Sequence, residues 1–226
     1  MKEFRDFLPI SLANEIHDKL TCNEFPWYWL DDVTANPADR QEVPDRLPSQ
    51  PGMHHTPYRE GVGSPFQQDF QFLYHYILDV MDLHWEDWYL SRIRCGLNFP
   101  TFREEHILHN QPHVDFPESE FVEHFTCLYY VNDSDGPTVV FNEKKKSEKY
   151  TIKYQCHPEK NKLFVFDGKH YHASSCPQHH DARLAVTINI VQRRAKASVK
   201  PFLRVAEFTS RRWCYIFKKF SREPNT

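Results

Sequence analysis

The segment HNQPHVDFPESEF, residues 109–121, contains an imidazole and a carboxylate only two positions apart. If this segment forms a strand, His113 and Asp115 project from the same face, because alternate side chains of a strand share a face. Two such side chains can bind one metal ion together, with a further ligand supplied by another strand. A polar loop that contains both residues by coincidence is the alternative, since the chain has 14 histidines.

The segment LFVFDGKHYHASS, residues 163–175, supplies two candidates for this further ligand, His170 and His172. Two histidines and one carboxylate that leave other coordination positions open form the ligand set of non-haem Fe(II) sites. The open positions matter chemically, because a co-substrate and dioxygen could both reach the metal there. These residue types and spacings therefore indicate a candidate iron site.

Arg183 lies eleven residues after His172 and begins the apolar segment RLAVTINI. A guanidinium can bind a carboxylate through two parallel hydrogen bonds, and a buried arginine without a partner is costly. Tyr130, in the apolar segment FTCLYYVN, carries a hydroxyl that could reach the same carboxylate. The alternatives are an arginine that faces solvent and a tyrosine that serves only in packing.

The elements that must position these residues follow from the spacing of apolar side chains. Apolar residues at helical spacing predict helices within residues 8–20 and 67–85. Residues 36–65 are rich in proline and are predicted to form a long loop, which could serve as a lid or as a wall of a substrate site. From about residue 91, apolar residues recur at every second position. This spacing predicts strands within residues 91–99, 125–132, 138–141, 150–156, 162–167 and 184–191. Helices followed by strands predict an α+β, mainly β, protein with the helices on one face of an antiparallel sheet or barrel.

The order of these features, HxD, a pair of strands, FVFDGKHYH and then arginine, resembles that of the Fe(II)- and 2-oxoglutarate-dependent oxygenases. HVD and TCLYYVN are similar to stretches of oxygen-sensing prolyl hydroxylases, and RIRCGLNFPT is similar to the strand before HxD in phage-type members. The resemblance covers about residues 91–191. It implies a double-stranded β-helix (jelly-roll) core with N-terminal helices packed on it.

The resemblance also implies a single oxygenase domain over residues 1–226. Residues 1–90 would form a helical and proline-rich N-terminal part, residues 91–192 the double-stranded β-helix core, and residues 193–226 a basic C-terminal extension.

The same resemblance implies the metal ligands. His113, Asp115 and His172 would bind Fe(II). His172 is preferred to His170 because the family places this histidine six residues after a phenylalanine, here Phe166.

The resemblance further implies how the co-substrate 2-oxoglutarate is held. Arg183 would bind its distal carboxylate, and Tyr130 would donate a hydrogen bond to the same group. Thr187 would supply another hydroxyl, since many members carry serine where this chain has Ala185. Prolyl hydroxylases carry a tyrosine where this chain has Phe99, so one hydrogen bond to the co-substrate would be lost.

The implied activity is hydroxylation of a substrate by dioxygen, with release of succinate and CO2, and ascorbate could keep the iron reduced. A protein side chain, such as a prolyl residue, or a small molecule is the favoured substrate. Two other functions stay open: a non-catalytic jelly-roll or cupin-like metal-binding module, and a nucleic-acid demethylase. The demethylase depends on the tail, residues 193–226, which has ten Lys and Arg against two acidic residues. A helix packed on the domain explains that tail equally well.

The composition excludes several other classes of protein. With six glycines, the chain contains neither GxxxxGK[ST] nor GxGxxG, so a glycine-rich phosphate loop is excluded. No apolar run approaches the roughly 18 residues of a membrane-spanning helix, and the N-terminus has no apolar signal core. The six cysteines form no CxxC pair, which is typical of free thiols in a reducing compartment. These features predict a cytoplasmic protein without a membrane partner.

Overall fold

The computed structural model describes residues 1–33, 50–100, 109–116 and 123–193. The predictions for the basic tail, and for the first part of the proline-rich segment, lie outside the described residues.

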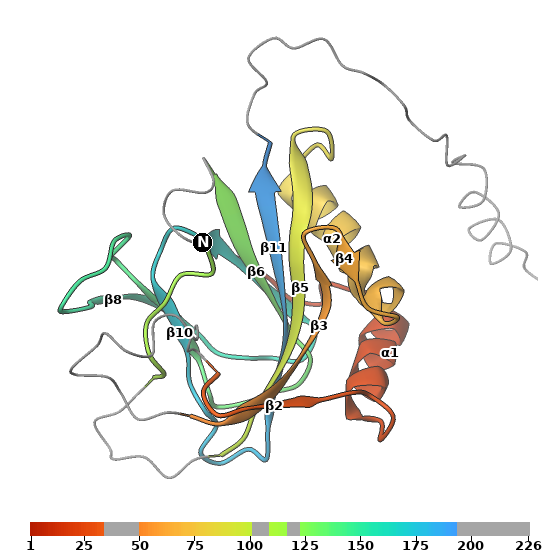
Figure 1. Ribbon diagram of the computed structural model, residues 1–226, viewed down its shortest axis with the longest axis horizontal. Coiled ribbons are helices and arrows are strands. Elements are labelled where there is room, and N and C mark those ends of the chain that lie inside the picture. Colours follow the sequence, from red (N-terminus) through yellow and green to blue (C-terminus); the bar gives the residue numbers. More distant parts are fainter. Residues whose placement is uncertain (34–49, 101–108, 117–122, 194–226) are drawn as a thin grey trace, which may run out of the picture. The chain divides into compact units, whose positions relative to one another are not determined.

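Two antiparallel sheets account for the described strands (Figure 1). The larger sheet has eight strands in the order β1-β9-β6-β11-β5-β3-β2, with β4 paired to β3. The smaller sheet has three strands in the order β10-β7-β8. In the larger sheet the strands are β1 (Lys2–Phe4), β2 (Tyr28–Leu30), β3 (Gly52–Arg59), β4 (Val62–Gly63), β5 (Trp88–Asn98), β6 (His124–Tyr130), β9 (Lys162–Asp167) and β11 (Arg183–Gln192). In the smaller sheet they are β7 (Thr138–Phe141), β8 (Ile152–Cys156) and β10 (His172–Ser174).

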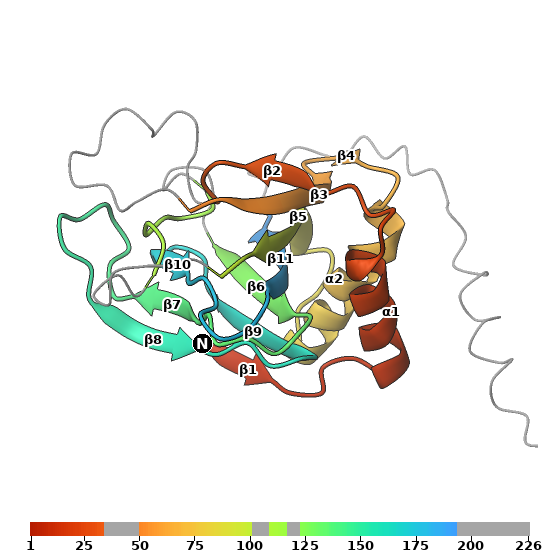
Figure 2. The same ribbon diagram turned by 90° about the horizontal axis from the view of Figure 1, so that it is seen from below.

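Helices α1 (Ile10–Thr21) and α2 (Gln67–Met81) lie on one side of the larger sheet, and the smaller sheet lies on the other (Figure 2). Each helix buries one apolar stripe, as Phe70, Leu73 and Ile77 do in α2. Both predicted helices and all six predicted strands are therefore confirmed. Neither helix has the length and apolar character that crossing a membrane requires, as far as the described residues go.

In strand β11, alternate side chains lie on the two faces of the larger sheet. Leu184 and Val186 point toward the helices and belong to the main hydrophobic core. The residues that alternate with them, Arg183, Ala185 and Thr187, project toward the smaller sheet and line a pocket. The period of two in the sequence thus separates a helix-facing core from a pocket-facing surface.

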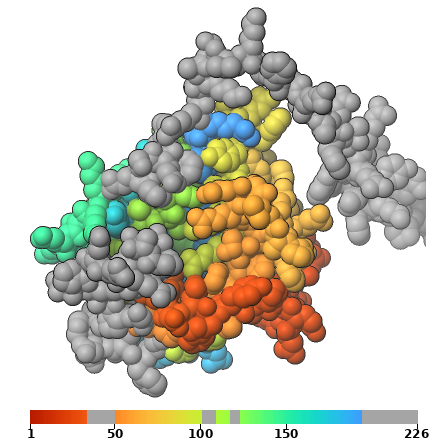
Figure 3. Space-filling model, in the orientation of Figure 1, coloured from red at the N-terminus to blue at the C-terminus, as the bar shows by residue number. Residues whose placement is uncertain are grey.

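The prediction of a loop over residues 36–65 is wrong for the part that the structure describes. Residues 52–59 form β3, which pairs with β5 from Gly52 opposite Asn98 onward. Pro57 is tolerated because the pairing shifts register between His55 and Tyr58, so no regular ladder bond is lost there. The N-terminal part of the chain therefore adds strands to the sheet as well as helices. In the space-filling view, helix α1 and the strands β2 and β3 (red to orange) lie together on the surface (Figure 3).

Candidate metal centre and adjoining pocket

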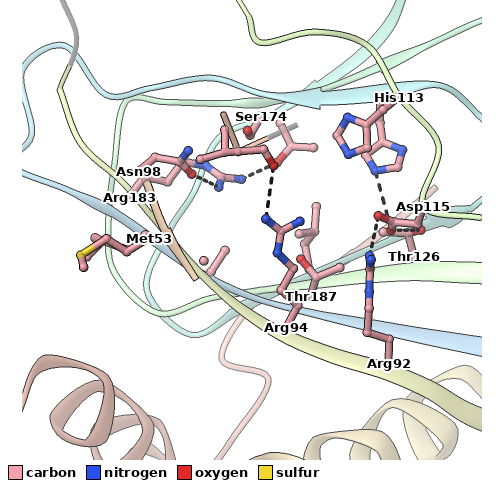
Figure 4. Close-up of a pocket in the computed structure, with 17 residues that line it drawn as sticks. Met53, Arg92, Arg94, Asn98, His113, Asp115, Thr126, Ser174, Arg183 and Thr187 are labelled. Carbon is pink, nitrogen blue, oxygen red and sulfur yellow. Dashed lines mark hydrogen bonds and ion pairs between the residues drawn. The ribbon is translucent and has the colours of Figure 1, made fainter. Parts of the chain in front are cut away.

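Three potential metal ligands gather at one end of the pocket between the two sheets (Figure 4). His113, Asp115 and His172 each offer one ligand atom, and these atoms lie within 4.8 Å of one another. The imidazole ring centroids of His113 and His172 are 4.6 Å apart, and His172 Nε2 lies 3.8 Å from Asp115 Oδ2. The three predicted ligands are therefore brought together.

Backbone pairing explains how residues so distant in the sequence meet. The amide of His113 donates to the carbonyl of His172 at 3.0 Å, and the amide of His172 donates to the carbonyl of His113 at 2.9 Å. His113 forms only this isolated bridge, so His113 and Asp115 do not lie on a regular strand. The bridge to β10, rather than strand periodicity, gives the two imidazoles a common site.

Each imidazole presents the nitrogen that a metal needs. Nδ1 of His113 lies 3.2 Å from the carbonyl of Gln111, and Nδ1 of His172 lies 3.1 Å from the carbonyl of His170. A carbonyl only accepts, so each Nδ1 carries the proton and each Nε2 keeps its lone pair for the site. Burial also lowers the pKa of His113 to about 4, with the neighbouring His172 acting in the same direction. His113 is therefore neutral, as a metal ligand must be, over the ordinary pH range.

Asp115 is held by three side chains that the sequence reading missed. Arg92 Nη2 donates to Oδ1 at 2.5 Å, while Asn189 Nδ2 and Thr126 Oγ1 donate to Oδ2 at 2.8 and 3.2 Å. Burial alone would raise the pKa of Asp115, but Arg92 and the two imidazoles hold it well below its usual value. The carboxylate is thus charged and oriented before any metal arrives.

His170 is turned away from this centre. Its Nδ1 lies 2.8 Å from the carbonyl of Phe141, and its Nε2 lies 3.1 Å from Nζ of Lys153. Both ring nitrogens are therefore engaged elsewhere, which favours His172 as the ligand.

Arg183 lies at the other end of the pocket, buried to 4% exposure. Its Nε donates to the carbonyl of Gly136 at 2.9 Å, its Nη2 to Thr138 Oγ1 at 2.8 Å and its Nη1 to Asn98 Oδ1 at 3.3 Å. All three acceptors are uncharged, so within the described part of the chain no carboxylate compensates this cation. Gly136 permits the arrangement, since a Cβ there would lie 2.6 Å from the carbonyl oxygen of Ser175.

Tyr130 stands behind the pocket rather than in it. Its hydroxyl donates to Thr138 Oγ1 at 2.8 Å, and its ring lies 5.6 Å from Arg183 Cζ. Thr138 lines the pocket in the place predicted for Tyr130. Because Thr138 Oγ1 already accepts from two donors, its own proton is available to a ligand in the pocket.

Thr187 lines the pocket, and Asn98 is a lining residue that the sequence did not single out. Asn98 precedes Phe99, the position expected to matter, and contacts Arg183 directly. Between the two ends, Gly96 and Ala185 face each other across β5 and β11. These small residues leave the floor of the pocket open between the candidate metal centre and Arg183.

No protein family model and no curated protein matches the sequence of this chain. Solved structures do resemble it. An oxidoreductase of the 2OG-Fe(II) oxygenase family from Burkholderia pseudomallei aligns over 82% of this chain and 81% of its own, with a TM-score of 0.55 and 11% identity. This chain has the fold of a 2OG-Fe(II) oxygenase.

Two further structures with this fold are those of a hydroxylase and of an epimerase. A prolyl hydroxylase from Trichoplax adhaerens, in complex with a peptide fragment of the hypoxia inducible factor oxygen degradation domain, aligns over 84% of this chain and 82% of its own, with a TM-score of 0.53 and 12% identity. The non-heme alpha ketoglutarate dependent epimerase SnoN of nogalamycin biosynthesis aligns over 89% and 87%, with a TM-score of 0.56 and 11% identity. At these identities the similarity concerns the fold.

Proposed function

We propose that this chain is an Fe(II)- and 2-oxoglutarate-dependent oxygenase that hydroxylates a protein side chain or a small molecule. One observation carries the proposal: a cluster of two imidazoles and one carboxylate lies at one end of a pocket, and a buried guanidinium with only neutral partners lies at the other. A ligand with a metal-chelating end and a distal carboxylate matches both ends.

The proposed role of each residue follows from its contacts. His113, Asp115 and His172 would hold the iron, and the backbone carbonyls and Arg92 described above keep their ligand atoms oriented. Iron, 2-oxoglutarate and dioxygen would supply the oxidative chemistry, with succinate and CO2 as products and with ascorbate as a reductant that keeps the iron active. The chain itself would bind, orient and desolvate the reactants.

Arg183 would anchor the distal carboxylate of 2-oxoglutarate, with the hydroxyl of Thr138 as an additional donor. Burying that carboxylate without a cation would cost several kcal/mol, more than neutral hydrogen bonds return. The Arg183 guanidinium, whose described partners are all neutral, would offset this cost. Tyr130 would support the anchor through Thr138, and Thr187 would contact the co-substrate near the metal.

We also propose that the two sheets form a double-stranded β-helix within a single oxygenase domain. Residues 91–192 supply most of its strands, and β3 extends the larger sheet from the N-terminal part. The alternative of a nucleic-acid demethylase depends on the tail, which lies outside the described residues.

The test begins with metal binding by the purified, full-length protein under anaerobic conditions. We expect one Fe(II) per chain, and we expect His172→Ala to abolish tight binding because only two ligands remain. His170→Ala is the matched control and should keep the iron, since His170 faces Phe141 and Lys153. Retention of iron by His172→Ala together with its loss from His170→Ala would reverse the assignment of the ligand.

The second measurement separates an enzyme from a binding module. Wild-type protein loaded with iron should bind 2-oxoglutarate in a calorimetric titration and release succinate slowly in air, even without its substrate. A protein that binds iron but neither binds 2-oxoglutarate nor forms succinate would instead be the non-catalytic jelly-roll metal-binding module.

A further inference from the structure

Arg94 is a third guanidinium in the pocket, and the proposed function gives it no role. It projects from β5 into the space between the candidate metal centre and Arg183 (Figure 4). Its Nη2 donates to the backbone carbonyl of Val33 at 3.2 Å. Of the described residues, none forms a carboxylate ion pair with it, since Asp115 is engaged by Arg92.

The charges that line the pocket are unbalanced. Its described lining contains three guanidinium groups, those of Arg92, Arg94 and Arg183, and one carboxylate, that of Asp115. Asp115 forms its ion pair with Arg92, so among the described residues Arg94 and Arg183 have no carboxylate partner of their own. Cations in a partly desolvated space favour an anionic ligand, and two of them favour a dianion.

The strand register orders these groups along the pocket. Arg92 pairs with Asn189, Arg94 with Thr187, Gly96 with Ala185, and Asn98 with Arg183. Alternate residues of β5 therefore follow the pocket from one end to the other. Arg92 lies beside Asp115, Arg94 and Gly96 come next, and Asn98 lies beside Arg183. A ligand that chelates the metal and reaches Arg183 must pass beside Arg94, and the end nearest Arg94 is the metal-chelating end.

We propose that Arg94 is a second anchor of the co-substrate, which binds the inner carboxylate of a 2-oxo acid while Arg183 binds the distal one. The proposal rests on the proposed function and extends it. It assigns the recognition of the co-substrate to two guanidiniums, one for each carboxylate, on the pocket-facing sides of adjacent strands. Arg94 keeps its charge for this role, because burial and Arg92 lower its pKa only to about 10.

Two ligands distinguish the anchors. 2-Oxoglutarate carries both carboxylates, whereas 2-oxopentanoate keeps the keto-acid end and lacks the distal carboxylate. The experiment is a calorimetric titration of each acid into the anaerobic, iron-loaded, full-length protein. The variants are Arg94→Met, Arg94→Lys and Arg183→Met, and Arg59→Met, at an exposed position of β3, is the matched control.

Arg94→Met should weaken both acids by a similar factor, about tenfold to a hundredfold, because a charge-assisted contact to their shared end is lost. The preference for 2-oxoglutarate over 2-oxopentanoate should stay as in the wild type. Arg183→Met should weaken 2-oxoglutarate alone and remove that preference. Arg94→Lys should recover part of the affinity for both acids, and Arg59→Met should change neither.

Affinities in Arg94→Met within about twofold of wild type for both acids, or a loss for 2-oxoglutarate alone, would overturn the proposal. Wild-type protein that binds neither acid would remove the proposed function as well, so the two failures are distinguishable.

A measurement on wild-type protein covers the case in which the variants do not fold. Arginine side chains are modified with phenylglyoxal in the iron-loaded protein, and the modified peptides are quantified by mass spectrometry. 2-Oxopentanoate should protect Arg94 but not Arg183, and 2-oxoglutarate should protect both. Modification of Arg94 that neither acid slows contradicts the proposal.

Discussion

Asp115 is the residue at which we expect the proposed metal binding and folding to be most directly coupled. Its carboxylate is buried, with a side chain only 5% exposed, and it accepts from Arg92, Asn189 and Thr126. A buried carboxylate needs such partners, and removal of one partner of a buried ion pair is strongly destabilising. Arg92 therefore compensates Asp115 in the metal-free protein, and a metal ion could take over this compensation.

Arg92→Met should accordingly destabilise the metal-free protein by a few kcal/mol, because the charge of Asp115 is left unpaired. A divalent metal restores the counter-charge, so the rise in the melting temperature on adding metal should be larger in the variant than in the wild type. Thermal unfolding with and without Mn(II) measures both quantities, and Arg92→Lys, which keeps the charge, should lie between the two proteins. An equal rise in all three would show that Arg92 does not compensate Asp115.

At the scale of elements, β5 and β11 divide their side chains between two environments. Ile93 and Cys95 of β5 are fully buried toward the helices, whereas Arg92, Arg94 and Gly96 line the pocket. The strand thus contributes to the core with one face and lines the pocket with the other. A substitution on the pocket-facing side should change binding without disturbing the core.

Gly96→Val tests this separation. A Cβ at Gly96 would meet only the carbonyl oxygen of Ala185, at 3.9 Å, so the side chain has room, and valine favours strand conformation. The variant should be at least as stable as the wild type and should bind iron normally. It should weaken 2-oxoglutarate by about tenfold or more, because the added methyl groups fill the floor between the metal centre and Arg183.

Calorimetric titration and thermal unfolding of the Gly96→Val protein give the two readouts. Wild-type affinity for 2-oxoglutarate would place the co-substrate away from the β5 floor. A large loss of stability would instead show that the helix-facing and pocket-facing sides are not independent.

At the scale of the whole molecule, buried imidazoles make stability depend on pH. Burial lowers the pKa of His55, His113 and His170 below the usual value, to about 4 for His113. As the pH falls below about 6.5, the unfolded chain binds more protons at these side chains than the folded chain does. The free energy of unfolding must therefore fall with the pH in this window. Asp115 adds to the loss only at lower pH, since its carboxyl group in the unfolded chain is protonated near pH 4.

We expect the melting temperature of the metal-free protein to be nearly constant above pH 7 and to drop by several degrees between about pH 6.5 and 5. Circular dichroism melts across this range measure the effect. His179→Gln, at an exposed position, is the control and should leave the slope unchanged. A melting temperature that stays constant or rises on acidification would contradict the prediction.

Much of this molecule was determined by local patterns in its sequence. The period of two between residues 91 and 191 predicted β5, β6, β7 and β11, which supply most of the pocket lining, because strand faces alternate regardless of which neighbour they pair with. It did not predict β10, which carries His172 and Ser174, or β3, which carries Met53. The sequence also contained the candidate site residues: an HxD pair, a histidine after an apolar strand and an arginine at the start of another. The alternation of Arg92 and Arg94 with Ile93 and Cys95 was equally present in the sequence, and it could have identified a charged, pocket-facing side of β5.

Only the tertiary structure decided which side chains meet. Residues 52–59 of the proline-rich segment form β3 because β5 offers them a partner edge, a contact with no local signal in composition. The partner of Asp115 is Arg92, 23 residues earlier in the sequence, and Tyr130 reaches Arg183 through Thr138 rather than reaching the pocket itself. Such pairings depend on strand register and chain closure, where a shift of one residue moves every side chain to the opposite face. Local periodicity contains no information about that register. The sequence therefore predicted the types of the candidate site residues, and only the tertiary structure determined which of them are in contact.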